Sequence, residues 1–350
     1  MEGWGQLTLG TPAALQEPPG APEVERAFAQ LCGLERAVLA PSTLALFWDL
    51  FHQLAREPVT LLWDEGLYPV ARWGIEHAAA RGVPAHSFAH HSPEALQDRL
   101  RRCTQRPVVV CDGFCPGCGR PAPLRAYLEA VRSRHGLLVL DDTQALGIHG
   151  TPADGAPYGA GGGGSLRQAG ISGPDVLCGA SLAKAFGAPM AAIAGPAAFI
   201  RRLAENSDVR VHCSPPSVPV LQAAARALEL NQLVGDELRA RLAGLVGRFR
   251  ERLREKELRA LGGLFPVQSL TPPTRLSAAD LHQRLERLGT KAVLQRSRCG
   301  ASALVTFLVT TGHSELDIDQ AVEHLAEAIG RPSGRHAQAA FLPMKQRSRT

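Results

Sequence analysis

Short runs of consecutive apolar residues alternate with longer stretches in which apolar residues recur every three or four positions. Five of these runs lie at residues 59–63, 107–111, 137–141, 175–178 and 189–194. Continuous apolar runs of this length are typical of strands that are buried on both faces. The stretches at 69–81 and 123–134 have the spacing of amphipathic helices. The alternation predicts an α/β large domain with a mainly parallel central sheet.

The pattern differs at both ends of this region. The first 21 residues are rich in glycine and proline and are expected to form an arm, and a helix is predicted from about Pro22 to Gly33. The large domain is therefore expected over residues 22–217.

Because the glycine-rich run at 159–164 does not follow a predicted strand, its match to GxGxxG is not interpreted as a dinucleotide site. We expect a flexible loop there.

After residue 217 the apolar spacing becomes that of long helices. Long helices are predicted at 218–230 and 236–259. They are followed by strands at 266–270, 291–295 and 303–310 and by helices at 277–288 and 315–329. Residues 218–330 are thus expected to form interdomain helices and a small C-terminal α+β domain. Residues 331–350 are basic and lack periodicity, which predicts a disordered tail.

Composition excludes several classes of protein. With 350 residues, 45% hydrophobic and 20% charged, the chain is too long for a single small module, and its net charge of +5 is too dispersed to indicate nucleic-acid binding. The most apolar long stretch, residues 185–200, is short and broken by two prolines, so no membrane span is expected. No leader-like pattern opens the sequence, and a cytoplasmic protein is predicted.

Eight cysteines are scattered along the chain, and reduced thiols are expected. Cys115-Pro116-Gly117-Cys118 has the spacing of a zinc or redox motif, but there is no second CxxC in the sequence and no histidine pair follows it. A structural zinc site normally needs four protein ligands. The sequence alone therefore predicts no metal.

Lys184 and Asp141 carry the most informative chemistry. Lys184 lies in Ser181-Leu182-Ala183-Lys184, and Asp141 ends the apolar run that begins at Leu137. Pyridoxal 5′-phosphate (PLP) requires an amine that forms an imine with its aldehyde, and a carboxylate that keeps its pyridine nitrogen protonated. A surface lysine and a strand-end aspartate are the simpler alternative.

Four further residues suit the same cofactor. Ser42 and Thr43 open an apolar helix whose N–H groups suit a phosphate, although capping alone would explain them. Tyr68 follows a predicted strand and is placed to stack on the cofactor ring, or simply to pack. Ser181 offers the phosphate a hydroxyl.

Several segments together resemble the fold-type I PLP enzymes, and most of all the α-oxoamine synthase group of the 8-amino-7-oxononanoate synthase type. The segments, which occur in the order of that group, are Leu31 to Gly33, Ala40 to Thr43, Asp112 to Phe114, Ala122 to Leu124, Leu140 to Gly150 and Ser181 to Gly187. The resemblance covers residues 22–330. It implies that Lys184 is the Schiff-base lysine, that Asp141 pairs with the pyridinium nitrogen, and that Ser181, Ser42 and Thr43 meet the phosphate. It also implies that Ser214 serves the phosphate of a neighbouring subunit, in a homodimer with shared active sites.

The chain also departs from that group. Gln144 stands where the group has a histidine near the cofactor O3′, Tyr68 stands where it has a stacking histidine, and the Cys-Pro-Gly-Cys run replaces Ser-Met-Asp-Gly. The arginine that grips the substrate carboxylate has no clear match. Val293 falls near its place, so Arg296 and Arg298, expected on a loop after the strand at 291–295, become the candidates.

The resemblance implies a decarboxylative condensation of an amino acid with an acyl thioester, in which Lys184 transfers the proton. An aminotransferase would use the same Lys184 and Asp141 and remains the main alternative. A PLP-binding regulatory protein is disfavoured because both residues are present. The amino acid, the acyl donor and its carrier are left open.

Overall fold

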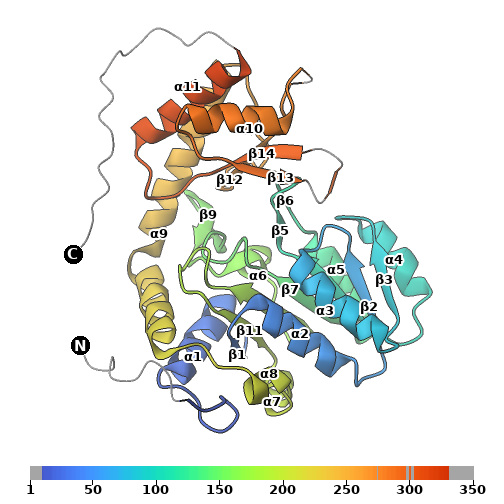
Figure 1. The fold of residues 1–350 in the computed structure, drawn as a ribbon. Coiled ribbons are helices and arrows are strands. Elements are labelled where there is room, and N and C mark those ends of the chain that lie inside the picture. Colours follow the sequence, from blue (N-terminus) through green and yellow to red (C-terminus); the bar gives the residue numbers. More distant parts are fainter. Residues whose placement is uncertain (1–9, 274, 297–298, 301–302, 331–350) are drawn as a thin grey trace.

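The computed structural model describes residues 10–273, 275–296, 299–300 and 303–330. A large unit surrounds a seven-stranded sheet, a small unit surrounds a three-stranded sheet, and one long helix runs through both (Figure 1). The predicted basic tail at 331–350 lies outside the described residues. None of the helices within the described ranges is long and apolar enough to span a membrane.

The central sheet has the strand order β1-β11-β10-β7-β4-β2-β3. The strands are β1 (Arg36–Ala40), β2 (Val59–Asp64), β3 (Ala85–Phe88), β4 (Arg106–Asp112), β7 (Leu137–Asp141), β10 (Val176–Ser181) and β11 (Ala191–Gly195). Only β11 runs antiparallel to its neighbours in this sheet, β1 and β10. The predicted α/β fold with a mainly parallel sheet is confirmed.

Helices cover both faces of this sheet. Helices α2 (Thr43–Leu54), α3 (Pro69–Ala80) and α7 (Ala197–Glu205) pack on one face, and α1 (Ala21–Cys32), α4 (Pro93–Arg101), α5 (Leu124–Arg132) and α6 (Gly164–Ala169) pack on the other. Central strand β7 explains the continuous apolar runs. Leu138 and Leu140 enter one core while Leu137 and Val139 enter the other, so every position must be apolar.

The glycine-rich run does follow a strand, contrary to the prediction from the sequence. It begins inside β9 (Ala156–Ala160), which pairs with β8 (Thr151–Ala153), and it ends at the first residue of α6. Gly159 has φ of 77°, and a Cβ there would lie 2.5 Å from the Thr151 carbonyl oxygen, so close strand packing requires glycine. Because this hairpin is separate from the central sheet, a dinucleotide-binding unit is still excluded.

The long helix α9 (Val218–Glu255) is continuous over 38 residues, so the expectation of two helices was wrong. Its first half contributes Leu221 and Leu228 to a core of the large unit, and its second half contributes Leu242 and Phe249 to the core of the small unit. The interruption in apolar spacing reflects this change of partner and not a break in the helix.

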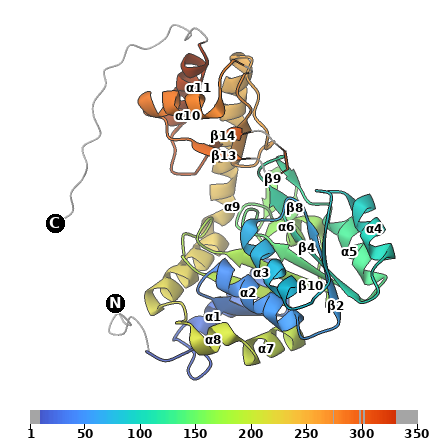
Figure 2. The same cartoon turned by 45° about the vertical axis from the view of Figure 1, so that its right-hand side comes forward.

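The small unit lies above the large one (Figure 2). Its antiparallel sheet has the order β12-β14-β13, with strands β12 (Val267–Leu270), β13 (Val293–Arg296) and β14 (Ala303–Leu308), covered by helices α10 (Ala278–Arg287) and α11 (Glu315–Ile329). Ser314 and Asp317 form a capping box that starts α11.

A hairpin from the large unit contacts the small unit beside this sheet. It consists of β5 (Phe114–Cys115) and β6 (Arg120–Pro121). The ring of Phe114 stacks on Phe265 with centroids 3.8 Å apart. A Cβ on Gly119 would lie 2.4 Å from the backbone nitrogen of Gly262, so the two backbones touch directly where both residues have positive φ. This contact holds the two units together at a second place besides α9.

Candidate active site

A small cavity opens at the carboxyl ends of β7 and β10. It is lined by Thr43, Tyr68, Val70, Asp112, Asp141, Thr143, Gln144, Ser181 and Lys184. In sheets of this kind, ligands collect beyond the carboxyl ends of the parallel strands. Six of the residues selected from the sequence therefore lie around one cavity, although they come from four separate segments.

Asp141 is the last residue of β7, and only 5% of its surface is exposed. Its Oδ1 accepts a hydrogen bond from the Thr143 N–H at 3.1 Å. The next residue, Asp142, is fully buried and accepts hydrogen bonds from the backbone and the hydroxyl of Ser165. Burial raises the pKa of Asp142 to about 7, against the lowering effect of those hydrogen bonds. Asp141 thus faces the cavity, whereas Asp142 anchors α6.

Lys184 follows β10 and lies across the cavity from Tyr68. Its Nζ is 5.9 Å from the centroid of the Tyr68 ring, which is a cation–π distance. Tyr68 precedes α3, and its N–H donates to Oδ1 of Asp112 at 3.1 Å. The aromatic ring and the amine therefore border the same cavity. The end of β4 positions Tyr68 through Asp112, and Lys184 follows the end of β10.

Backbone hydrogen bonds fix the turn that carries Lys184. The Ser181 N–H donates to Oγ1 of Thr143 at 2.9 Å, and Oγ of Ser181 accepts from the Ala183 N–H at 3.2 Å. The segment after β7 and the segment after β10 are thereby tied together. Gln144 lies on this junction and lines the cavity with Lys184.

Ser42 and Thr43 have different positions at the start of α2. Ser42 is exposed and caps the helix, because its Oγ accepts from the Ala45 N–H at 3.2 Å. Thr43 lines the cavity, whereas Ser42 is not among the lining residues. The positive end of α2 lies beside the cavity, which suits a phosphate.

Ser214 is not at this cavity within the same chain. It is exposed and lies between the short helix α8 (Asp208–His212) and α9, where it lines a different hollow that also contains Pro41. Its predicted service to a neighbouring subunit stays a prediction.

Arg296 ends β13 instead of lying on the loop that follows, which corrects the expectation from the sequence. Val293 and Gln295 of this strand line a second cavity, but Arg296 does not, and its side chain is exposed. Side chains alternate along a strand, so Arg296 lies on the side opposite to Val293 and Gln295. Arg298 lies outside the described residues.

The second cavity, of about 800 Å³, adjoins the first and shares Gln144 and Lys184 with it. Its walls come from the large unit, α9 and the small sheet, and they are mainly apolar, with Ile148, Phe186, Leu230, Leu238, Phe265, Val293 and Leu308 among them. Arg239 also lines this cavity. Its guanidinium donates to Asn231, Asp236 and the Gly147 carbonyl, so its donors serve the protein itself.

Asp112 and Thr143 are cavity residues that the sequence interpretation did not select. Asp112 ends the apolar run of β4 as Asp141 ends that of β7, and that position was the available signal. Thr143 gave no signal, since its role depends on the hydrogen bond to Ser181.

Comparisons with known proteins agree with this architecture. The family model for aminotransferase class I and II matches residues 7–325. The 8-amino-7-oxononanoate synthase of Serratia proteamaculans is 28% identical over 314 residues, covering 86% of this chain and 76% of the relative. Among solved structures, the serine palmitoyltransferase of S. paucimobilis, with a bound PLP-myriocin aldimine, superposes with a TM-score of 0.81 at 17% identity, covering 94% of this chain and 82% of the other. The 8-amino-7-oxononanoate synthase of Francisella tularensis gives 0.73 at 19%, covering 89% and 88%.

Proposed function

This chain belongs to the aminotransferase class I and II family, and we propose that it is a PLP-dependent acyltransferase that condenses an amino acid with an acyl thioester and releases carbon dioxide. The relatives are 8-amino-7-oxononanoate synthases, as the resemblance to α-oxoamine synthases implied. The observation that carries the proposal is the position of Lys184, which lies where the small cavity, with its many polar side chains, meets the large cavity.

The residues of the small cavity fit PLP. An amine and a buried carboxylate face the same space, an aromatic ring borders it, and a helix N-terminus lies beside it. Lys184 would hold the aldehyde carbon, Asp141 the pyridine nitrogen and Tyr68 the ring face. Thr43 and Ser181 would hold the phosphate. When bound, PLP supplies an electrophilic carbon and a cationic ring that accepts electrons.

Two side chains of the protein move or hold protons in this proposal. Lys184 takes the proton from the amino-acid α-carbon once its amine is released. Asp141 keeps a proton on the pyridine nitrogen, and its 5% exposure strengthens that charge interaction by excluding water. Gln144, at the junction of both cavities, is placed to donate a neutral hydrogen bond near Lys184.

The large cavity supports an acyl substrate. Its apolar walls would bury a hydrocarbon chain, and burial contributes about 0.8 kcal/mol per CH₂ group. With PLP in the small cavity, an aminotransferase of small amino acids would leave most of the large cavity unused. The joined pair of cavities therefore favours the synthase over the aminotransferase.

A homodimer is also proposed. Large apolar side chains are exposed on α2, α3 and α8, at Leu44, Trp48, Trp73 and Val211. Ser214 follows α8 and lies near Pro41, one residue before Ser42. A partner that covers this face would bring its own Ser214 toward the phosphate end of the cavity.

Product analysis tests the proposed reaction. The purified protein is incubated with a panel of amino acids, each with and without acyl thioesters of increasing chain length, and carbon dioxide and thiol release are measured. We expect both products only when a thioester is present. Formation of a 2-oxo acid without any thioester would instead establish the aminotransferase.

Chemical labelling tests the cofactor in the same preparation. Borohydride reduction and peptide mapping are expected to place the phosphopyridoxyl group on Lys184 and to find none in Lys184→Ala. A label on another lysine of the wild-type protein would contradict the proposed site.

A further inference from the structure

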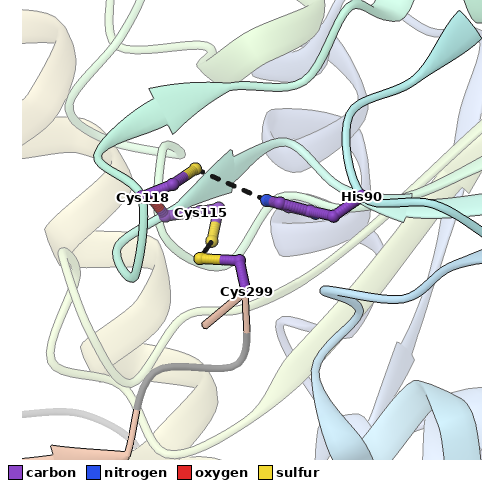
Figure 3. Close-up of side chains that lie close together, drawn as sticks. All are labelled: His90, Cys115, Cys118 and Cys299. Atoms are coloured by element: carbon purple, nitrogen blue, oxygen red, sulfur yellow. Dashed lines mark hydrogen bonds between the residues drawn. The ribbon is translucent and has the colours of Figure 1, made fainter. Parts of the chain in front are cut away.

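Three cysteines and one histidine converge where the hairpin of β5 and β6 contacts the small unit, and the proposed reaction does not use them (Figure 3). His90 follows β3, Cys115 is in β5, Cys118 is in the hairpin turn, and Cys299 lies between β13 and β14. Their three Sγ atoms and one ring nitrogen of His90 all lie within 4.8 Å of one another. The CxxC pair therefore has the two partners that the sequence pattern did not reveal.

Two of the separations among these atoms match those around a tetrahedral ion. The Sγ atoms of Cys115 and Cys299 are 3.7 Å apart, and Nε2 of His90 is 3.4 Å from Sγ of Cys118. A tetrahedral zinc with its usual bond lengths separates two sulfur ligands by about 3.8 Å and a sulfur from a nitrogen ligand by about 3.5 Å. A disulfide would need a sulfur separation of about 2.0 Å.

The imidazole of His90 is oriented for a ligand at Nε2. Its Nδ1 lies 2.5 Å from Oδ1 of Asp64, a carboxylate with 2% exposure. Asp64 is itself held by the N–H groups of Gly66 and His91 and by the hydroxyl of Tyr127. A carboxylate behind the non-coordinating nitrogen is the usual support of a zinc-binding histidine, because it fixes the tautomer and the ring orientation.

The backbone around His90 is adapted to this geometry. A Cβ on Gly66 would lie 2.3 Å from Nδ1 of His90, so only glycine leaves room for the imidazole. His91 has φ of 55°, a strained value for a residue with a side chain. Across the hairpin, the Gly119 N–H donates to the Cys115 carbonyl at 2.8 Å and closes the CxxC turn.

We propose that His90, Cys115, Cys118 and Cys299 bind one Zn²⁺ ion. Three sulfur ligands and one imidazole select zinc over magnesium or calcium, which prefer oxygen ligands. All four coordination positions are filled by the protein, so the site is structural and closed to substrate. The absence of a metal predicted from the sequence is thereby revised, because the fold supplies His90 and Cys299.

The ion would join the two units at the wall of the large cavity. Cys115 and Cys118 belong to the large unit, whereas Cys299 belongs to the small unit. Pro116, between the two hairpin cysteines, lines the large cavity. Zinc binding would therefore fix the position of this wall without contacting the reacting atoms.

Metal analysis of the intact protein tests the site. Protein is produced in zinc-supplemented medium, dialysed, and analysed for zinc, iron and copper together with its PLP content. We expect about one zinc per chain. In the metal-depleted protein, added Co²⁺ should give the intense ligand-field bands of a tetrahedral ion and the thiolate charge-transfer bands. Iron alone, or neither zinc binding nor these bands, overturns the proposal.

Single substitutions assign the ligands. Cys118→Ser and Cys299→Ser should each weaken zinc binding at least tenfold, and Asp64→Asn should weaken it by about ten- to a hundredfold through His90. Cys103→Ser is the matched control, since that half-buried cysteine lies at the other end of the sheet and bonds the Gln105 carbonyl. Wild-type zinc affinity in both ligand variants overturns the assignment. A Cys115–Cys299 disulfide in the untreated, zinc-free protein would overturn it in favour of a redox pair.

Discussion

Asp141 and Asp112 are register partners at the carboxyl ends of the neighbouring parallel strands β7 and β4. The two carboxylates have different roles at the small cavity. Asp112 accepts the Tyr68 N–H and positions the aromatic ring, while Asp141 accepts the Thr143 N–H. The proposed pairing of Asp141 with the ring nitrogen rests on its place in the wall of the small cavity.

Asp141→Asn should retain the cofactor but slow the reaction. The neutral amide fills the same space and still accepts the Thr143 N–H, yet it cannot stabilise a protonated pyridine nitrogen. We expect cofactor absorbance to remain and α-proton exchange, measured by deuterium incorporation into the amino acid, to fall by about 10²- to 10⁴-fold. Asp112→Asn is the comparison and should act mainly through Tyr68. Near-normal exchange in Asp141→Asn would remove Asp141 from its role.

Shared active sites predict complementation between subunits. Light scattering should give a dimer at assay concentrations. Mixed dimers of Lys184→Ala and Ser214→Ala subunits should contain two unlike sites. One site lacks both residues and the other lacks neither, so activity should recover relative to either homodimer. A fully active monomer would contradict the shared site.

The two candidate arginines are expected to differ. Arg298→Ala should raise KM for the amino acid by about ten- to a thousandfold, as expected when a charge-assisted contact to a carboxylate is lost. Arg296→Ala is the control and should leave KM within about threefold, because Arg296 does not line the large cavity. Equal, wild-type KM values in both variants would mean that other groups hold the substrate.

His149 should make the folded state sensitive to acid. It is buried among the rings of Phe114, Tyr158 and Phe265, and burial lowers its pKa to about 4. Below pH 6.5 His149 becomes protonated in the unfolded chain, whereas in the folded chain it stays neutral down to about pH 4. The free energy of unfolding should therefore fall as pH decreases through this window, by about 3 kcal/mol from this group.

His149→Gln separates this effect from the titration of carboxylates. Urea unfolding at several pH values between 4 and 7 should show a shallower pH dependence in the variant, which cannot take up the proton. Identical slopes for both proteins would exclude His149 as the cause.

Removal of the proposed zinc should destabilise the folded protein. A metal that binds only the folded state stabilises it in proportion to RT ln(1 + [L]/Kd), which is about 4 kcal/mol at a thousandfold excess over Kd. We expect a chelator to lower the Tm by several degrees, measured by calorimetry, and zinc to restore it. Cys118→Ser should show the lower Tm with no response to chelator, whereas Cys103→Ser should respond as the wild type does.

The sequence predicted the sheet and the central pair of the small cavity because both depend on local signals. Buried strands appear as apolar runs, and Asp141 and Lys184 lie in recognisable segments directly after such runs. Positions that depend on distant contacts were not predictable. Helix α9 was predicted as two helices because its two halves pack against different cores. Cys299 lies beside Cys115 although the two residues are 184 positions apart in the sequence. Arg296 was misplaced because the end of a short edge strand carries little local signal.

The large and small units are connected at two separate places, by the contact of Phe114 with Phe265 and by the continuous helix α9. At about 1.5 Å per residue, α9 is about 57 Å long, and it contributes side chains to the cores of both units. We expect two separated contacts to resist rotation of the small unit against the large one and so to keep the width of the large cavity nearly constant. We therefore expect its wall residues to act as a ruler for acyl chain length, and substrate choice should change with side-chain volume at positions such as Leu238 and Val293.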